Sequence, residues 1–414
     1  MTLAELGERC GYSAAQISRY ERGIARLDTT LLRAFAAILE IPPADLGLSP
    51  QGDTPRAAES PDLRFLPPGS RKVVAVTSGK EDPVRRRDLL LSAGLAAPAT
   101  LLARVNAALA VMPAPHTRVS APVVTALLRN VQGQFDSGRL AELVHGIPGL
   151  LAVGHELTGQ SGGERHLPLL AGCYDLASEA LHKSGSTQAA RITADRAVTY
   201  ARLSGDPAAE AMAARSLAIV LRHEGRQDLA AEVTRAAAGR LTGSGLRTNT
   251  AANALAQVLC TAAYSAAQAG DRSEADAIIT EARKSAQHVP VGLAGIPRFT
   301  VTLPQVTLYQ VGIWWSLGEP GAALRAARGL HPAQFPTPER RARLLTDLAR
   351  VWDLAGQPER AIGALLSACG QAASEVRDRP SIRSLASDLI RDHPADPRAP
   401  RLSGILVSGG QRQA

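Results

Sequence analysis

The chain has 414 residues, enough for two or three domains with a sizeable apolar core. Apolar residues make up 45% of it and aromatic residues only 3%, a mixture that favours closely packed helices over β-sandwiches and barrels. The net charge of +8 is compatible with nucleic-acid binding, although a solvated basic surface gives the same count.

The residues of metal sites and common catalytic motifs do not occur at the required spacings. Val74 stands where a P-loop needs its first glycine, and His155-Glu156 lacks the second histidine of a zinc-protease motif. We therefore expect no enzyme, no metal and no cofactor. Reduced thiols in a cytoplasmic protein are expected, because no CxxC pair occurs among the four cysteines. They are Cys10, Cys173, Cys260 and Cys369.

The first 48 residues predict short helices with clear caps. Thr2 and Glu5 form a capping box for a first helix, Leu3 to Arg9. Gly11 is placed at a sharp turn, and Ser13 caps a second helix, Ala14 to Arg22. A third helix is expected from about Thr29 to Leu39, followed by a short element from Ala44 to Leu48. The apolar positions expected in the core of this unit include Ile17, Leu31, Leu32, Phe35, Ile38 and Leu39.

The ordered set Leu6, Gly11, Ser13, Ile17, Ser18, Arg19, Glu21, Arg22 and Gly23 resembles the Cro/phage-repressor (XRE) type of helix-turn-helix. The resemblance implies that the second helix enters the major groove of double-stranded DNA. Arg19 is expected to read a base, whereas Arg22 and Arg26 hold phosphates. The family carries another helix before the one that begins at Thr2. We therefore expect either that the natural start lies upstream of Met1 or that this copy of the DNA-binding unit is degenerate. The DNA-binding residues implied are Ser13, Ala14, Ala15, Gln16, Ser18, Arg19, Arg22 and Arg26.

Residues 120–396 repeat a pattern of glycine and alanine. Alanine stands five residues after each repeated glycine, and a small residue precedes the glycine by seven positions in four of five cases. A glycine lets the first helix of a hairpin end, and small residues let two helix backbones approach. The sequence thus predicts an all-α superhelix of hairpins, with a weaker sixth hairpin around Gly138. The repeated glycines are Gly185, Gly225, Gly270, Gly318 and Gly356.

This pattern resembles the tetratricopeptide repeat (TPR) with a longer period, which implies a groove for a peptide, small molecule or protein. Polar and aromatic side chains outside the repeat pattern are the candidate groove residues. The alternative for the aromatic residues is core packing, and for the asparagines a solvated face or a cap. The candidates are Asn249, Asn253 and Gln257 on one helix and Arg298, Gln305, Tyr309 and Trp314 on the next hairpin.

Three further segments complete the organisation. Residues 49–84 are rich in proline and glycine and predict a flexible basic linker. Residues 85–119 predict a docking helix, Leu89 to Ala103, and a connector. The run after Arg85-Arg86-Arg87 resembles a twin-arginine export signal, but a helix buried against the repeats is the favoured interpretation. Residues 397–414 predict a disordered tail.

Taken together, the chain resembles actinobacterial XRE regulators with a C-terminal TPR-like domain. The segments Leu317–Leu324, Thr337–Leu345 and Glu375–Pro380 extend the resemblance. It implies a cytoplasmic homodimer that binds DNA and does not contact a membrane. The alternatives are a TPR-like interaction scaffold that has lost DNA binding and an exported protein.

Overall fold

The computed structural model describes most of the chain after residue 98. The described residues are Leu6, Arg9, Ile17, 35–39, Ile41, 99–114, 119–160, 162–245, 248–289 and 300–407. The chain divides into two compact units, Met1–Arg86 and Arg87–Ala414, each described by itself. Across these ranges the secondary structure is helical, with no strand, as the composition predicted. None of the helices described is long and apolar enough to cross a membrane.

In the N-terminal unit, two of the aliphatic and aromatic positions expected in the core are buried. Ile17 is 2% exposed and Phe35 is 8% exposed. Residues 35–38 are helical, and the N–H of Leu39 donates to the carbonyl of Phe35. Leu39 was expected in the core and is exposed instead, because the helix gives way to a turn at this residue.

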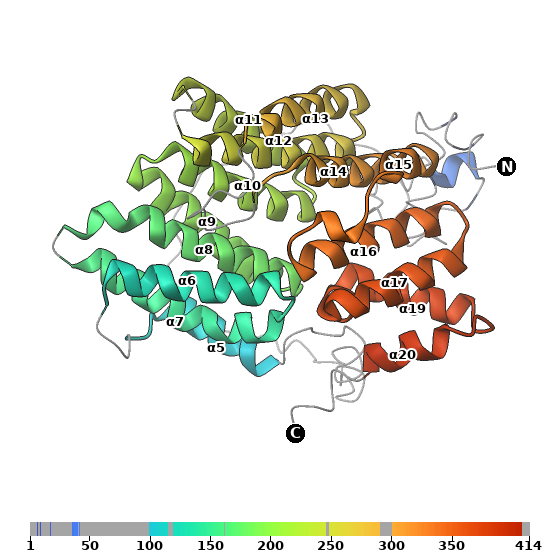
Figure 1. The fold of residues 1–414 in the computed structure, drawn as a ribbon, viewed down its shortest axis with the longest axis horizontal. Helices are drawn as coiled ribbons and strands as arrows, with labels where there is room; N and C mark the ends of the chain where they lie inside the picture. The colour runs from blue at the N-terminus through green and yellow to red at the C-terminus, as the bar shows by residue number, and fades with distance from the viewer. Residues whose placement is uncertain are drawn as a thin grey trace, which may run out of the picture. The chain divides into compact units, whose positions relative to one another are not determined.

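The second unit is built of helical hairpins that follow one another along the chain (Figure 1). A single helix, α5 (Ala99–Ala110), precedes them. The hairpins are α6 (Ala121–Asp136) with α7 (Leu140–Gly159), α8 (Leu167–Lys183) with α9 (Thr187–Ser204), α10 (Pro207–His223) with α11 (Gln227–Gly243), α12 (Asn249–Ala269) with α13 (Arg272–Gln287), α14 (Leu303–Ser316) with α15 (Pro320–Ala327), and α16 (Pro338–Leu354) with α17 (Pro358–Ala372). The chain continues through α18 (Ser374–Arg377), α19 (Pro380–Asp392) and α20 (Ala399–Val407), and short 3-10 turns lie at Gly163–His166 and Pro332–Gln334.

The repeated glycines end the first helix of each hairpin. All five have a positive φ, between 68° and 87°, a conformation that costs a residue with a Cβ more than it costs glycine. The alanine five residues later is fully buried in every hairpin, at 0% exposed. Gly138 has the same conformation, and Leu143 five residues on is also fully buried. The predicted hairpins, including the weaker sixth, are therefore confirmed.

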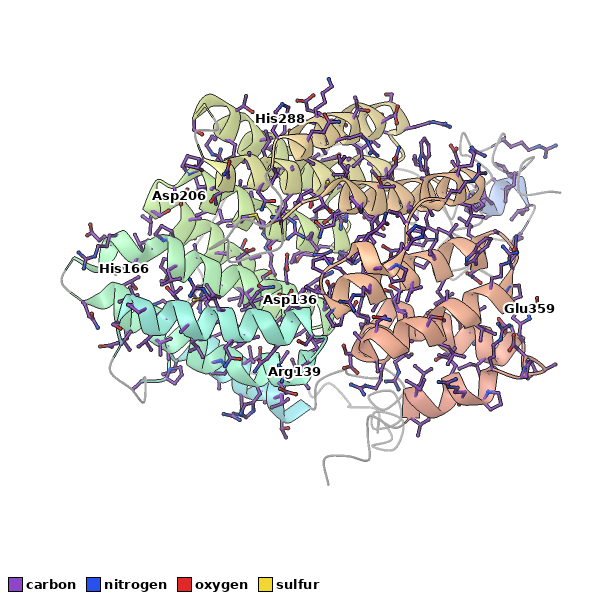
Figure 2. All side chains as sticks on the ribbon, viewed as in Figure 1. Asp136, Arg139, His166, Asp206, His288 and Glu359 are labelled. Carbon is purple, nitrogen blue, oxygen red and sulfur yellow. The ribbon has the colours of Figure 1, made fainter. Side chains whose placement is uncertain are left out.

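The first helices of successive hairpins form a continuous inner row. Helices α8, α10, α12, α14 and α16 contact one another in turn. The row also closes on itself, since α6 contacts α16 and Ser374 Oγ donates to the carbonyl of Gly138 at 2.5 Å. Figure 2 labels Asp136 and Arg139 at this end of α6. The inner faces of the hairpins consequently surround a shared interior.

Helix α5 packs against this superhelix through α7 and α9. Val105 and Leu109 are buried there, and Arg196 of α9 donates from Nη2 to the carbonyl of Leu109 at 2.9 Å. The docking helix expected at Leu89 to Ala103 overlaps only the start of α5. Residues 89–98 lie outside the described part of the chain.

The disorder expected from residue 397 is wrong for Ala399–Val407, which form α20. Leu402 is 0% exposed and Leu406 is 8% exposed, and both belong to a core cluster with residues of α17 and α19. Two leucines four positions apart lie on one face of a helix, and that face is covered here. The proline- and glycine-rich composition of the tail concealed this short amphipathic pattern.

Candidate DNA-reading helix and the inner face of the repeats

The DNA-contacting residues implied by the XRE resemblance, from Ser13 to Arg26, lie outside the described part of the chain, as do Leu31 and Leu32. Ile17, in the middle of the expected recognition helix, is described and buried. A position two residues from a buried one lies on roughly the opposite side of a helix. That Arg19, two positions after Ile17, faces away from the core of this unit stays a prediction.

The groove candidates do not all lie in one place. Asn249 is exposed in the first turn of α12, whereas Asn253 is 2% exposed and its Oδ1 accepts a hydrogen bond from the N–H of Val301 at 2.7 Å. This contact braces the chain before α14, so Asn253 is neither a cap nor on a solvated face. Trp314 packs in an apolar cluster with Val311, which matches the core alternative.

Three other candidates, Gln257, Gln305 and Tyr309, lie on the inner helices α12 and α14. Gln257 is 2% exposed and Gln305 is 3% exposed. Neither side-chain amide atom of Gln305 has a hydrogen-bond partner. Tyr309, one turn further along α14, is partly exposed and contacts Arg215 of α10. The remaining candidate, Arg298, lies outside the described residues.

Sequence reasoning missed a set of charged side chains on this face, which we call the inner network. They come from α8, α10, α16 and the segment from α18 to α19, and most are largely shielded from solvent. The seven cations exceed the five carboxylates, which leaves an excess of two positive charges. The inner network comprises Lys183, Arg215, Arg222, Arg340, Arg343, Arg350 and Arg379 with Asp175, Glu179, Glu339, Asp347 and Glu375.

Arg215 is the most deeply buried cation of the inner network, at 3% exposed. Its Nη1 pairs with Glu179 of α8, and its Nη2 donates to the hydroxyl of Tyr309 at 3.4 Å. Burial alone would lower the pKa of Arg215, but the Glu179 carboxylate raises it above its usual range. Burial would likewise raise the pKa of Tyr309, but Arg215 and Arg340 lower it. The charge of Arg215 is thus compensated by Glu179, and the side chain ties α8 to α10 and α14.

A second group joins the two ends of the repeat domain. Lys183 of α8 pairs with Glu339 of α16 and, at 2.5 Å, with Glu375 of α18. Arg379 also pairs with Glu375, at 3.0 Å. Burial would raise the pKa of Glu339, but Arg340 and Lys183 lower it to about 2. These carboxylates are therefore already neutralised by the cations around them.

On α16, one carboxylate serves two guanidinium groups. Arg343 Nε lies 2.8 Å from one oxygen of Asp347, and Arg350 Nη1 lies 3.5 Å from the other. Arg350 also donates from Nη2 to Ser381 Oγ at 2.8 Å. Burial, together with the positive charge of Arg379, lowers the pKa of Arg350 to about 10. Arg350 is thus only partly compensated by negative charge.

Arg222 of α10 is the least compensated cation of the inner network. Its Nη1 donates to Ser265 Oγ at 3.2 Å, and its guanidinium lies 4.7 Å above the ring centroid of Tyr264, both on α12. None of the carboxylates in the described residues pairs with it, and its buried Nε has no partner. Burial lowers the pKa of Arg222 to about 10. A guanidinium in such a place is available for a negatively charged partner.

Two histidines pack against each other beside Arg222. The ring centroids of His182 on α8 and His223 on α10 are 4.1 Å apart in an edge-to-face arrangement. Burial and the charge of Arg222 lower the pKa of His223 to about 4, and burial and His223 lower that of His182. His223 nevertheless keeps an exposed surface. His223 thus lies among the cations of the inner network and is still reached by solvent.

A sequence signal for the inner network exists in hindsight. Arg215 and Arg222 on α10, and Arg343 and Arg350 on α16, are each seven positions apart. A spacing of seven places both members of a pair on one helix face. Because both helices are the first of their hairpins, the four arginines share the inner face. Periodicity alone could not reveal which of them would find a carboxylate.

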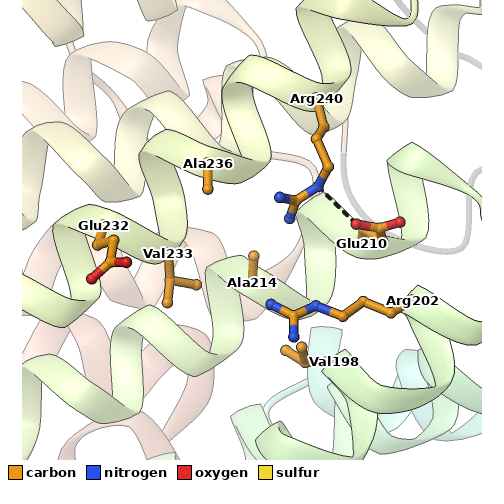
Figure 3. Close-up of a pocket in the computed structure, with 8 residues that line it drawn as sticks. All are labelled: Val198, Arg202, Glu210, Ala214, Glu232, Val233, Ala236 and Arg240. Carbon is orange, nitrogen blue, oxygen red and sulfur yellow. Dashed lines mark ion pairs between the residues drawn. The ribbon is translucent and has the colours of Figure 1, made fainter.

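A small pocket lies elsewhere, between α9, α10 and α11 (Figure 3). Arg202 and Arg240 line it with Glu210 and Glu232, and Arg240 pairs with Glu210 at 2.8 Å. Its volume of about 100 Å³ is below the range of roughly 300 Å³ and more that is typical of small-molecule sites. Opposite charges in equal number leave this pocket no net preference for an anion.

The described residues include no cluster of three or more potential metal ligands. Cys173 and Cys260 are buried, Cys369 is partly exposed, and all three are free thiols. Burial raises the pKa of Cys173 and of Cys260 to about 12, so these two thiols remain protonated and unreactive.

Comparison with known proteins gives a match to a family model and a weak likeness to solved structures. No curated protein matches the chain. The crystal structure of BtubC (BKLC) from P. vanneervenii is similar with a TM-score of 0.36 and 18% identity, over 59% of this chain and 91% of that one. Residues 1–46 match the family model described as helix-turn-helix. This match supports a DNA-binding transcription regulator with an XRE-type helix-turn-helix at its N-terminus.

Proposed function

We propose that this protein is a sequence-specific DNA-binding transcription regulator whose helical-repeat domain binds a ligand or a second copy of the chain. The observation that carries the proposal is the match of residues 1–46 to the helix-turn-helix family. The burial of Ile17 and the net charge of +8 agree with it. The protein acts in the cytoplasm and performs no catalysis.

In this proposal Arg19 makes the main base contact from the helix Ala14 to Arg22. A bidentate contact from a guanidinium to guanine contributes about 1–3 kcal/mol of discrimination between bases. Arg22 and Arg26 bind phosphates and set the position of the helix without reading sequence. The remaining contacts come from Ser13, Ala14, Ala15, Gln16 and Ser18.

The repeat domain supplies the regulatory input. Its inner face gathers charged and polar groups, which suits a ligand better than a purely apolar core would. A homodimer would present two recognition helices to half-sites about 34 Å apart, one turn of DNA. Regulation would follow if the ligand changes that spacing.

The test is fluorescence anisotropy of the full chain with DNA from upstream of its own gene, across a salt series. We expect binding that weakens steeply with salt, because phosphate contacts release counterions. Arg19→Ala should weaken binding to this DNA roughly 10-fold or more but change binding to unrelated DNA much less, as expected for a base contact.

Arg391→Ala is the matched control, since it removes the same charge from an exposed helix end. It should leave both affinities unchanged. If the full chain binds neither DNA at low salt, or if Arg19→Ala and Arg391→Ala behave alike, the proposed reading of DNA by this helix is wrong.

A further inference from the structure

We propose that the inner face of the repeats carries a binding site for a small molecule with a doubly charged oxyanion group, held between Arg222 of α10 and Arg343 and Arg350 of α16. The inference rests on the ligand-binding role proposed above, and it names the chemical class of the ligand. Neither the family match nor the structural comparison bears on this site.

Arg222 and Arg350 converge on one turn of α14. Arg222 of α10 lies 4.7 Å from the ring centroid of Tyr264, and that ring packs directly against Gly312 of α14. Arg350 of α16 lies 5.0 Å from the ring centroid of Trp315, three positions after Gly312 on the same helix. Side chains separated by more than 100 positions along the sequence thus meet at this turn.

The carboxylates of the inner network are too few for its cations. Glu179 is paired with Arg215, and Glu339 and Glu375 are paired with Lys183. Asp175 accepts a hydrogen bond from Ser216 Oγ. Asp347 is the one carboxylate among the described residues that pairs with both Arg343 and Arg350.

Arg222 has only a hydroxyl group and an aromatic ring as partners among the described residues. A cation that is kept from water without a counter-charge is costly. The excess of two positive charges in the inner network therefore favours a ligand that brings two negative ones.

Several buried polar atoms on α10, α12 and α14 have no hydrogen-bond partner. Arg222 Nε has no partner, and neither does the hydroxyl of Thr261, which is 1% exposed. Thr261 lies one turn before Ser265, the residue that Arg222 contacts on α12. Gln305, with both amide atoms unpaired, lies one turn before Tyr309 on α14. Buried polar groups are normally paired, so atoms left over beside a cation point to a polar ligand.

Solvent reaches the two arginines of α16. The side chain of Arg343 is 28% exposed and that of Arg350 is 13% exposed. The exposed surface of His223 adds a neutral imidazole, which can donate one hydrogen bond. The planar guanidinium binds a phosphate or a carboxylate through two parallel hydrogen bonds, and such bonds strengthen away from water. Phosphoryl and dicarboxylate groups are the two sources of this chemistry.

The experiment titrates the full chain with inorganic phosphate and, separately, with malonate, and follows binding by isothermal titration calorimetry and thermal unfolding. Potassium chloride at the same ionic strength is the reference. We expect saturable binding and a rise in Tm with at least one of the two anions. Chloride should produce neither effect. A response to phosphate alone identifies a phosphoryl group, and a response to malonate alone identifies a dicarboxylate.

Arg222→Gln and Arg350→Gln, made separately, should each weaken the Kd roughly 10-fold or more, the loss expected for one charge-assisted contact. Circular dichroism shows whether each variant is folded. If one of the two fails to fold, the other still tests the site. Arg240→Gln is the matched control, because it removes the same charge from the small pocket between α9, α10 and α11. It should leave the Kd unchanged.

The inference is overturned if chloride reproduces the response, if neither anion saturates, or if the folded Arg222→Gln and Arg350→Gln variants bind as tightly as the parent. DNA binding is measured on the same samples. DNA binding without anion binding would refute the oxyanion site alone. Anion binding without DNA binding would refute the regulator and leave the site.

Discussion

At the scale of single residues, the inner face carries two arginines of different character on one helix. Arg215 is paired with a carboxylate, and Arg222 is not. Arg215 is buried and Arg222 half-buried, and only Arg215 has a carboxylate as its counter-charge among the described residues. This contrast separates what an arginine contributes to stability from what it makes available for binding.

The contrast leads to a prediction for stability. Arg215→Gln leaves Glu179 buried without its cation, and breaking a buried pair costs about 3–5 kcal/mol. Arg222→Gln leaves no carboxylate behind, so we expect a loss of about 1 kcal/mol or less from the lost hydrogen bond to Ser265. Urea denaturation at pH 7 measures both. Equal losses would contradict the assignment of Arg222 as an uncompensated cation.

At the scale of helices and turns, the hairpins could be predicted because their signals are local. A glycine with positive φ ends a helix, and an alanine lets two helices cross closely. Both effects are local, so Gly225 and Ala230 indicate a helical hairpin from the sequence alone. The inner network could not be predicted in this way. Lys183 and Glu339 meet across 156 positions, and only the closure of the row of inner helices brings them together.

The groove candidates illustrate the same limit. The groove candidates were chosen as side chains outside the repeat pattern. Their helix face could not separate Asn253, which braces a loop, from Gln305, whose amide atoms have no partner. Helix α20 was missed for a related reason. Its stability comes from covering α17 and α19, which its own composition does not show.

The turn glycines offer a prediction that isolates the backbone. Gly225 has φ of 78° and nothing within 4 Å of an added Cβ, so Gly225→Ala should destabilise the protein through backbone strain alone, by about 1 kcal/mol. Gly239, within α11, also has open space but no positive φ. Gly239→Ala should therefore stabilise the protein by about 0.5–1 kcal/mol. Thermal unfolding of the two variants should move in opposite directions, and a shared sign would contradict this account.

At the scale of the whole repeat domain, the first two hairpins are joined to the last one, and to α18 after it, by contacts between residues far apart in sequence. Lys183 bridges α8 to α16 and α18, and the carbonyl of Gly138 accepts a hydrogen bond from Ser374. Open repeat arrays bury surface only between neighbours. Here the closing contacts also enclose the polar interior, so the charge balance of that interior contributes to the stability of the domain as a unit.

This coupling predicts a pH dependence. The folded pKa of His223 is about 4 and that of His182 is also lowered, because burial and the nearby Arg222, Arg350 and Arg379 oppose protonation. The unfolded chain, with histidine pKa values near 6.5, binds more protons between about pH 4 and 6.5. Stability should therefore be full above about pH 6.5 and fall as the pH drops towards 4.

His223→Gln should flatten this loss, measured as the urea midpoint at pH 7 and pH 5. His288→Gln is the matched control, because its Nδ1 contacts the carbonyl of Lys284 at 2.8 Å just as that of His223 contacts Ile219. The two histidines end their helices alike and differ in the cations that face them. If both variants keep the parent's loss of stability between these pH values, the pair of His182 and His223 does not make the interior sensitive to acid.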